Sequence, residues 1–205
     1  MIAYRKRTCF SLSLLTVLWF CAAPRSAQSQ PTPSTSEPVQ QTPRFKKGTH
    51  LGIKTFLAAP AADLADLGNI STSPGFRVHG GMWLHENVAV HVAYRYISIV
   101  ENHTPDDLFY YDVQLGLSTR FQLTPRIAIY GDLDLIHGLL SITEPVVDYT
   151  VTNRYMGSGM ATRVTAFTHL ANGWDLGLGA SFSITDTEGF RSGFLALEAA
   201  LSWNH

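Results

Sequence analysis

Hydrophobic and polar residues alternate along most of the chain after Gly48. In residues 109–121, FYYDVQLGLSTRF, the odd positions are apolar or aromatic except Thr119, and most even positions are polar or small. Alternation with a period of two over this length predicts a β-strand with unlike faces. The pattern alone leaves open which face meets water. A soluble barrel turns its polar face outward, whereas an outer-membrane barrel turns its apolar face to lipid.

Seven further segments alternate in the same way, so the sequence predicts eight strands. They are residues 50–57, 75–83, 87–97, 108–121, 126–140, 155–170, 174–184 and 190–203. The first, third, fifth and seventh connections are long or longer, whereas the three between them, 84–86, 122–125 and 171–173, are short. This alternation of long and short connections is typical of an up-and-down barrel in an outer membrane, which has short periplasmic turns and longer outer loops. An even number of strands also allows closure without a free edge.

One face of the predicted strands is rich in Gly, Ala and Ser, with charges placed singly among them. Small residues are expected where eight strands enclose a narrow lumen. The lumen-facing polar network is predicted to consist of Lys54, Arg77, His91, Arg95, Asp112, Arg120, Asp132, Asp134, Arg163, Asp175 and Glu198. Desolvated charges are tolerated only when they are paired and hydrogen-bonded. We therefore expect these residues to plug the lumen; a polar path for protons or small solutes is the alternative.

The opposite face of the strands is apolar and carries no formal charge. Aromatic residues lie near both ends of this face. Those near the long loops are Tyr94, Tyr96, Phe109, Tyr111 and Phe182, and those near the short turns are Phe121, Trp174 and Trp203. Two belts of aromatic residues around an apolar band are typical of membrane barrels, in which the belts lie at the lipid interfaces. The predicted fold is all-β, an eight-stranded antiparallel up-and-down transmembrane β-barrel.

The sequence before the barrel has two parts. Residues 1–29 read as a signal peptide, because Arg5, Lys6 and Arg7 precede an apolar stretch shorter than a membrane span. Residues 30–47 are rich in Pro, Ser and Thr and predict an extended periplasmic linker. The barrel is then expected to occupy residues 48–205. An N-terminal membrane anchor and lipidation at Cys21 are the alternatives for the first segment.

Cysteine content and charge limit the partners of the exported chain. Both cysteines, Cys9 and Cys21, lie in the predicted signal peptide, so disulfides are not expected. From Gln30 onward there are 11 Lys and Arg residues against 16 Asp and Glu residues. An acidic chain without basic clusters argues against a nucleic-acid partner.

Residues 48–205 resemble the small eight-stranded outer-membrane barrels of the OmpA-domain, OmpX and OmpW kind. The ending Ala199-x-Leu201-x-Trp203 is similar to the signal by which the barrel assembly machinery recognises its clients, although Asn204 and His205 follow the aromatic residue. The resemblance implies a monomer in the bacterial outer membrane, in contact with lipid and lipopolysaccharide. It also implies a structural or surface-interaction role without a cofactor, with a small-solute channel as the alternative.

Two further groups of residues, inward-facing histidines and acidic loop residues, are candidates for a site. His79 and His91 face inward, but no tight ligand spacing is visible, so we expect no metal site. The predicted outer loops are acidic, which favours solvation or loose bridging to lipopolysaccharide by divalent cations. These acids are Asp63, Asp66, Glu101, Asp106, Asp107, Glu144, Asp148, Asp186 and Glu188.

An enzyme that modifies lipid A is the remaining alternative. A hydrolase of this kind would need a serine hydrogen-bonded to a histidine. His137 is the candidate base on the outer face, and Ser141 follows it in the chain. Their spacing differs from the His-x-Ser arrangement that the resemblance to lipid A deacylases implies, so we expect no catalytic residues.

Overall fold

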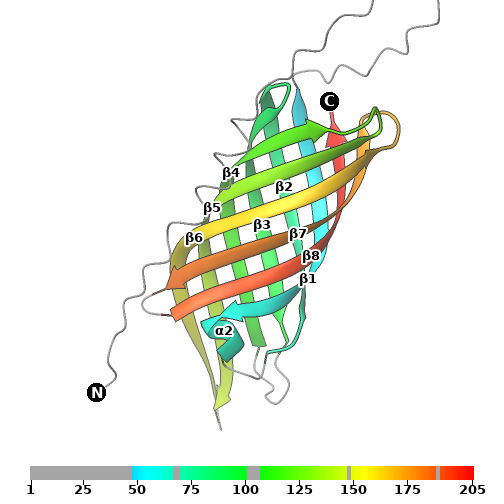
Figure 1. Ribbon diagram of the computed structural model, residues 1–205. Coiled ribbons are helices and arrows are strands. Elements are labelled where there is room, and N and C mark those ends of the chain that lie inside the picture. Colours follow the sequence, from blue (N-terminus) through cyan, green and yellow to red (C-terminus); the bar gives the residue numbers. More distant parts are fainter. Residues whose placement is uncertain (1–47, 67–69, 101–106, 147–148, 188–189) are drawn as a thin grey trace, which may run out of the picture. The chain divides into compact units, whose positions relative to one another are not determined.

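A computed structural model describes residues 48–66, 70–100, 107–146, 149–187 and 190–205. Eight antiparallel strands form a closed barrel, in which each strand pairs with the next one and β8 pairs with β1 (Figure 1). The strands are β1 (Thr49–Ala62), β2 (Ser73–His85), β3 (Val88–Ile99), β4 (Asp107–Gln122), β5 (Ile127–Val146), β6 (Tyr149–His169), β7 (Trp174–Thr187) and β8 (Phe190–Asn204). The predicted eight-stranded antiparallel barrel is therefore confirmed.

The side chains of each strand point alternately into the barrel and away from it, as the period of two requires. On β3, Ala89, His91, Ala93 and Arg95 are buried, whereas Val92 between them is 54% exposed. The same alternation holds on β7 and β8. The predicted inner and outer faces therefore correspond to the inside and outside of the barrel.

The two ends of the barrel differ, and we name them by their connections. The turn rim contains Thr49, Asn204 and the short turns after β2, β4 and β6. In the last of these turns Asn172 and Gly173 both have positive φ, a conformation that suits Asn and Gly. The loop rim contains the other ends of the strands and the four-residue helix α2 (Asp63–Asp66).

The fifth connection was predicted as a long loop, and this prediction was wrong. β5 and β6 continue to pair up to Val146 and Tyr149, so most of residues 141–154 form a β-hairpin beyond the ends of the neighbouring strands. Two features explain this extension. Residues 149–152 are rich in β-branched and aromatic side chains, which favour strands, and antiparallel pairing with β5 satisfies the backbone groups of alternate residues.

The interior has three layers, and only the middle one is strongly polar. Towards the loop rim lies an apolar cluster that includes Phe56, Ile97, Leu140 and Phe194, and Leu64 of α2 packs into it. Towards the turn rim lies a second, largely aromatic cluster of Trp83, Ala89, Ala128, Tyr130, Phe167 and Ala200. The expectation of a polar lumen therefore holds most fully for the middle of the barrel, because apolar and aromatic side chains occupy much of the space towards the two rims.

No helix in the described part of the chain is long and apolar enough to cross a membrane. The predicted signal peptide and the predicted linker lie outside the described residues.

Candidate functional site

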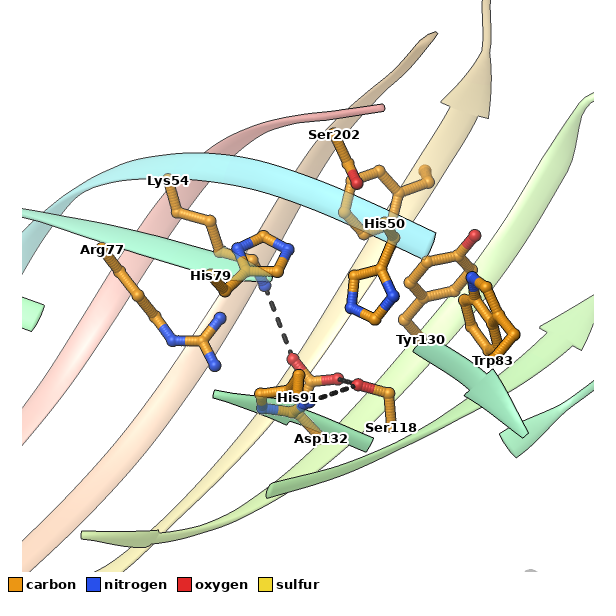
Figure 2. Close-up of a pocket in the computed structure, with 11 residues that line it drawn as sticks. His50, Lys54, Arg77, His79, Trp83, His91, Ser118, Tyr130, Asp132 and Ser202 are labelled. Carbon is orange, nitrogen blue, oxygen red and sulfur yellow. Dashed lines mark hydrogen bonds and ion pairs between the residues drawn. The ribbon is translucent and has the colours of Figure 1, made fainter. Parts of the chain in front are cut away.

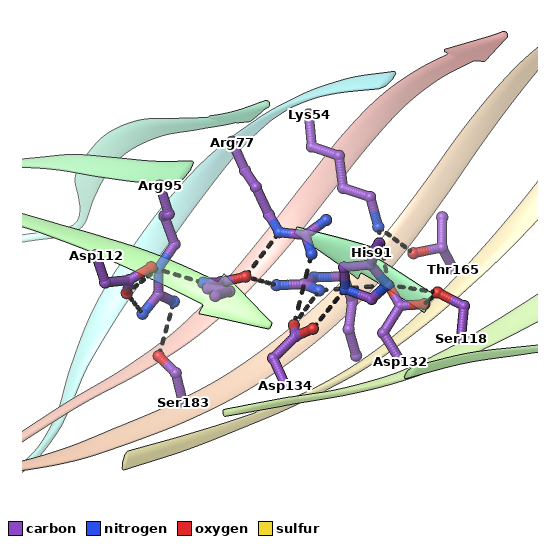
Figure 3. A network of polar contacts seen from close by, with 12 residues as sticks. Lys54, Arg77, His91, Arg95, Asp112, Ser118, Asp132, Asp134, Thr165 and Ser183 are labelled. Carbon is purple, nitrogen blue, oxygen red and sulfur yellow. Dashed lines mark hydrogen bonds and ion pairs between the residues drawn. The ribbon is translucent and has the colours of Figure 1, made fainter. Parts of the chain in front are cut away.

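The middle of the interior is filled by buried charges from several strands (Figure 3). Arg163 of β6 contacts three carboxylates. Its Nε donates to Glu198 over 3.0 Å, and its Nη1 lies 2.8 Å from Asp134 and 3.3 Å from Asp132. Arg77 of β2 approaches Asp134 from another side, with 3.6 Å between the nearest nitrogen and oxygen. Each of these charges therefore has an opposite charge close by, which offsets the cost of removing it from water.

Lys54 of β1 connects two of the same carboxylates. Its ammonium lies 3.6 Å from Asp132 and 3.5 Å from Glu198, and it donates to Thr165 Oγ1 over 3.1 Å. Figure 3 shows the Lys54 ammonium directed at the hydroxyl of Thr165, which lies on β6, a strand that does not pair with β1. The network therefore joins strands that are far apart in the chain.

The network continues towards the loop rim through Gln114. Its side-chain oxygen accepts from Arg77 Nε over 2.8 Å, and its nitrogen donates to Asp112 over 2.8 Å. Asp112 also accepts two hydrogen bonds from Arg95, whose Nη1 donates to Ser183 over 2.8 Å. Arg95 and Asp112 are direct partners across β3 and β4, so adjacent strands hold this pair in place.

Arg120 and Asp175 lie nearer the turn rim. The guanidinium of Arg120 stacks over the Trp83 ring, 4.3 Å from its centroid. Asp175 accepts from Asn204 over 2.6 Å and lies 2.8 Å from His169. All eleven residues predicted for the lumen thus point inward, although these two belong to the layer that contains the aromatic cluster.

His91 of β3 is hydrogen-bonded at both ring nitrogens. Its Nε2 lies 2.5 Å from Asp134, and its Nδ1 lies 3.0 Å from Ser118 Oγ. Ser118 in turn donates to Asp132 over 2.7 Å. Charged hydrogen bonds of this kind fix the orientation of a ring more firmly than neutral ones. His91 therefore forms part of the structural network.

Sequence reasoning missed a third buried histidine beside His79 and His91. His50 of β1 faces the same small cavity of about 10 Å³, room for roughly one water molecule (Figure 2). The ring centroids are 5.7 Å apart for His50 and His79, and each lies 6.5 Å from that of His91. His50 is the first residue of the first predicted strand, 50–57, so its alternation parity with Lys54 could have revealed it.

Each of the three imidazoles packs against a glycine on a neighbouring strand. The pairs are His79 with Gly52, His50 with Gly81, and His91 with Gly116. A Cβ on any of these glycines would lie only 2.3 to 2.7 Å from the nearest ring atom and would clash with it, so the glycines create the space for the rings. As placed here, no three His, Cys, Asp or Glu side chains of the described segments could hold a metal ion.

The outer surface of the barrel is apolar between the two rims. Large aliphatic side chains are more than half exposed there, among them Leu197 (73%), Leu178 (71%), Leu135 (61%) and Leu115 (60%). Soluble monomers rarely expose large continuous apolar surfaces. The distribution of charged and apolar side chains is thus the reverse of that in a soluble protein, because the charged side chains lie inside the barrel and the leucines lie outside it.

The predicted interfacial aromatics all lie on this outer face. Towards the loop rim, four of them form one cluster, Tyr94, Tyr96, Phe109 and Tyr111, in which the ring centroids of contacting pairs are 5.6 to 6.5 Å apart. Phe76, which the sequence did not predict as an interfacial residue, belongs to the same cluster. Phe182 is 45% exposed on β7. Near the turn rim, Phe121 and Trp174 are each 43% exposed, and Trp203 stacks on His205.

The candidate enzymatic pair is not brought together. Ser141 is fully buried, whereas His137 is exposed on the outer face. His137 Nδ1 instead lies 3.1 Å from Ser158 Oγ on the adjacent strand β6. Asp186 of β7 lies opposite Ser158 in the sheet, on the side away from His137.

Few of the predicted loop acids fall on described side chains. Asp63 accepts a hydrogen bond from the Arg191 backbone N–H over 2.7 Å, and Asp186 lies 3.7 Å from the Arg191 guanidinium. Asp66 is exposed at the end of α2. The side chains of the others, Glu101, Asp106, Asp107, Glu144, Asp148 and Glu188, lie outside the described part.

Comparison with known proteins identifies the fold. No protein-family model matches the chain, and no curated protein matches it significantly. Among solved structures, Neisserial surface protein A (NspA) superimposes with a TM-score of 0.61 at 14% identity, over 77% of this chain and 97% of that one. Ail, the attachment invasion locus protein of Yersinia pestis, superimposes with a TM-score of 0.50 at 14% identity, over 77% and 100%. The chain therefore has the fold of the small eight-stranded outer-membrane β-barrels.

Proposed function

We propose that this chain is a bacterial outer-membrane protein with a structural or surface-interaction role, rather than an enzyme or an open channel. The observation that carries the proposal is the inverted surface, with large exposed apolar side chains on every strand of a closed barrel and paired ions inside it. In lipid such a wall is favourable, because closure satisfies every backbone group of the sheet and the apolar side chains meet acyl chains.

The filled interior supports a role other than conduction. Apolar clusters occupy both ends of the lumen, and the charges between them are held by one another. The pocket beside His50, His79 and His91 has room for about a single water molecule. We therefore assign activity to the outer surface and the loop rim.

The proposed partners follow from this placement. The aromatic cluster on β2, β3 and β4 would lie at the lipid interface, where aromatic rings are favoured. The loop rim would face lipopolysaccharide, and the terminal strand β8 would be the segment read by the barrel assembly machinery. The chain would act as a monomer, since a closed barrel has no free edge within the membrane.

Purification of the chain from Gln30 onward, with and without detergent, tests the proposal. We expect the protein to require detergent, to insert into lipid vesicles, and to migrate differently on gels before and after boiling. A monodisperse, folded protein in buffer without detergent would overturn the membrane assignment in favour of a soluble barrel.

A further inference from the structure

Trp83 fills part of the interior at the turn rim. It lies near the end of β2, and yet its side chain is only 6% exposed. Arg120 of β4 covers the face of the indole, 4.3 Å from its centroid, and Tyr130 of β5 meets it edge-on, with 5.6 Å between the ring centroids. The ring of His50 on β1 packs against it at 5.5 Å. The indole is therefore enclosed by three other strands, and Figure 2 shows it beside His50 and Tyr130.

The polar edge of the indole is tied to the last strand. Its Nε1 donates to Asn204 Oδ1 on β8 over 3.2 Å, and Asn204 Nδ2 donates to Asp175 on β7 over 2.6 Å. A primary amide can accept one hydrogen bond and donate another at the same time. In the closed barrel β1 lies between β2 and β8. The side chain of Asn204 therefore ties β2 to β7 across β1.

The backbone and a further carboxylate contact hold Asn204 in position. Its N–H donates to the Gly173 carbonyl over 2.8 Å. Its acceptor Asp175 is in turn 2.8 Å from His169 of β6. The line of contacts from Trp83 through Asn204 and Asp175 to His169 thus joins four strands at the turn rim.

The small cavity beside the three imidazoles extends from the indole towards the charged middle of the barrel. Trp83 and Ser202 belong to its lining together with His50, His79 and His91. The Nδ1 atoms of His50 and His79 are buried, and neither has a hydrogen-bond partner among the described residues. Such nitrogens can hydrogen-bond water or another small polar molecule. The indole therefore separates a polar cavity from the turn rim.

We propose that Trp83 is a lid between this cavity and the periplasmic side, and that Asn204 is the latch that holds the lid closed. When the latch is released, the indole moves away from the cavity, and water or a small polar solute reaches the imidazoles from the turn rim. The apolar cluster that includes Phe56 and Leu64 still closes the route from the loop rim. The lid goes beyond the proposed surface role, because it concerns access to the interior from one side only.

Cysteine labelling of the barrel in lipid nanodiscs tests the lid. The chain from Gln30 onward contains no cysteine, so one introduced thiol is the only target. Ser202→Cys places this thiol in the lining of the cavity. Ser183→Cys places a matched thiol beside Arg95, nearer the loop rim, and both serines are 2% exposed. A small water-soluble methanethiosulfonate reagent is added, and mass spectrometry measures the labelling rate of each variant.

Release of the latch should expose only the thiol in the cavity. With the lid closed, both thiols should be labelled slowly. Asn204→Ala should raise the labelling rate of the Ser202→Cys thiol about tenfold, the factor that corresponds to the loss of about one net hydrogen bond. The same substitution should leave the labelling rate of the Ser183→Cys thiol within about twofold.

Trp83→Phe separates the hydrogen bond from the bulk of the ring. It removes the N–H that Asn204 accepts and keeps an aromatic ring, so it should raise the labelling rate of the Ser202→Cys thiol by a similar factor. Adding Asn204→Ala should bring little further change, because both substitutions break the same hydrogen bond. Trp203→Phe is the matched control, since Trp203 stacks on His205, and it should change neither labelling rate.

The outcomes separate the lid from a general loosening of the barrel and from the proposed function. Unchanged labelling of the Ser202→Cys thiol in folded Asn204→Ala and Trp83→Phe barrels would overturn the lid. Equal acceleration at both thiols would also overturn it, because the whole barrel would then be opening. Rapid labelling of the Ser202→Cys thiol with the latch intact would have the same meaning. A chain that stays soluble without detergent would refute the proposed function, whereas the labelling rates in buffer would still test the lid.

Discussion

The guanidinium of Arg163 lies 2.8 Å from the carboxylate of Asp134 on the neighbouring strand, and neither side chain is exposed to solvent. Both groups belong to a network that occupies the middle of a barrel with an apolar outer wall. The pair therefore shows how this chain places its strongest electrostatic contacts where a soluble protein would place its apolar core.

Replacing Arg163 by Leu should strongly destabilise the barrel. Asp132, Asp134 and Glu198 would keep only Lys54 and Arg77 as cationic partners, so one buried carboxylate charge would lose its compensation, which costs about 3–5 kcal/mol. Urea unfolding in lipid vesicles, followed by tryptophan fluorescence, would measure the loss. Arg191→Leu is the control, since its ion pair with Asp186 is exposed and contributes less than about 1 kcal/mol. Equal stability of the two variants would contradict the network described here.

Gly116→Ala should also destabilise the barrel, for a steric reason. An added Cβ would lie 2.7 Å from His91 Nε2 and closer still to the Asp134 carboxylate, so their hydrogen bond would have to shift. Overpacking of this kind costs about 1–3 kcal/mol. At Gly131 the nearest atom is a threonine hydroxyl at 3.3 Å, so Gly131→Ala should change the unfolding midpoint little. Equal changes in the unfolding midpoint for the two variants would contradict this steric explanation.

Leu178→Arg distinguishes a lipid-facing wall from a water-facing one. Leu178 is 71% exposed midway along β7, between Trp174 and Phe182. In a bilayer, an arginine there should cost about 2–4 kcal/mol, whereas Asn153→Arg on the projecting hairpin should cost little. Unfolding in vesicles measures both. In water-facing surroundings both changes would be nearly neutral, and that result would count against the membrane assignment.

The wild-type barrel should not conduct ions. Apolar clusters close both ends of the lumen, and paired charges fill its centre. Planar bilayers fused with proteoliposomes should show no discrete current steps, even when a gel of the same vesicles confirms a high protein load. Reproducible steps that scale with the amount of protein would support the channel alternative.

His137→Ala should leave the lipid A of the host unchanged. His137 contacts the Ser158 hydroxyl, but no carboxylate of the described residues forms a hydrogen bond with the imidazole. Mass spectra of lipid A from cells that overexpress the wild type, His137→Ala and Ser158→Ala should therefore be identical. A change in acylation with the wild type that both variants abolish would establish an enzyme.

The strands were predictable because the period of two is a local property of the chain. The inward placement of Asp112, Gln114 and Arg120 follows from the same parity that exposes Val113 and Leu115, and the structure retains it. The extent of the β5–β6 hairpin was not predictable in this way. Its length depends on how far β5 and β6 continue to pair with each other beyond their last residues paired with β4 and β7.

The contacts between side chains inside the barrel could not be predicted from the alternation either. Parity placed Arg163, Asp134 and Glu198 in the lumen, but it could not say that one guanidinium contacts both carboxylates. It also could not predict that His50 lies beside His79 and His91, or that the hydroxyl partner of His137 is Ser158 and not Ser141. These contacts depend on the register between strands, which fixes which residues lie opposite each other.

The sequence by itself determined the number of strands, the two faces of each and the compartment they suggest, because alternation and composition act within a few residues. Only the tertiary structure decided that the lumen is apolar at both ends, that a network centred on Arg163 fills its middle, and that the edge of β6 projects beyond β7. Closure of the barrel sets the register around all eight strands together, so these features depend on contacts that no single segment specifies.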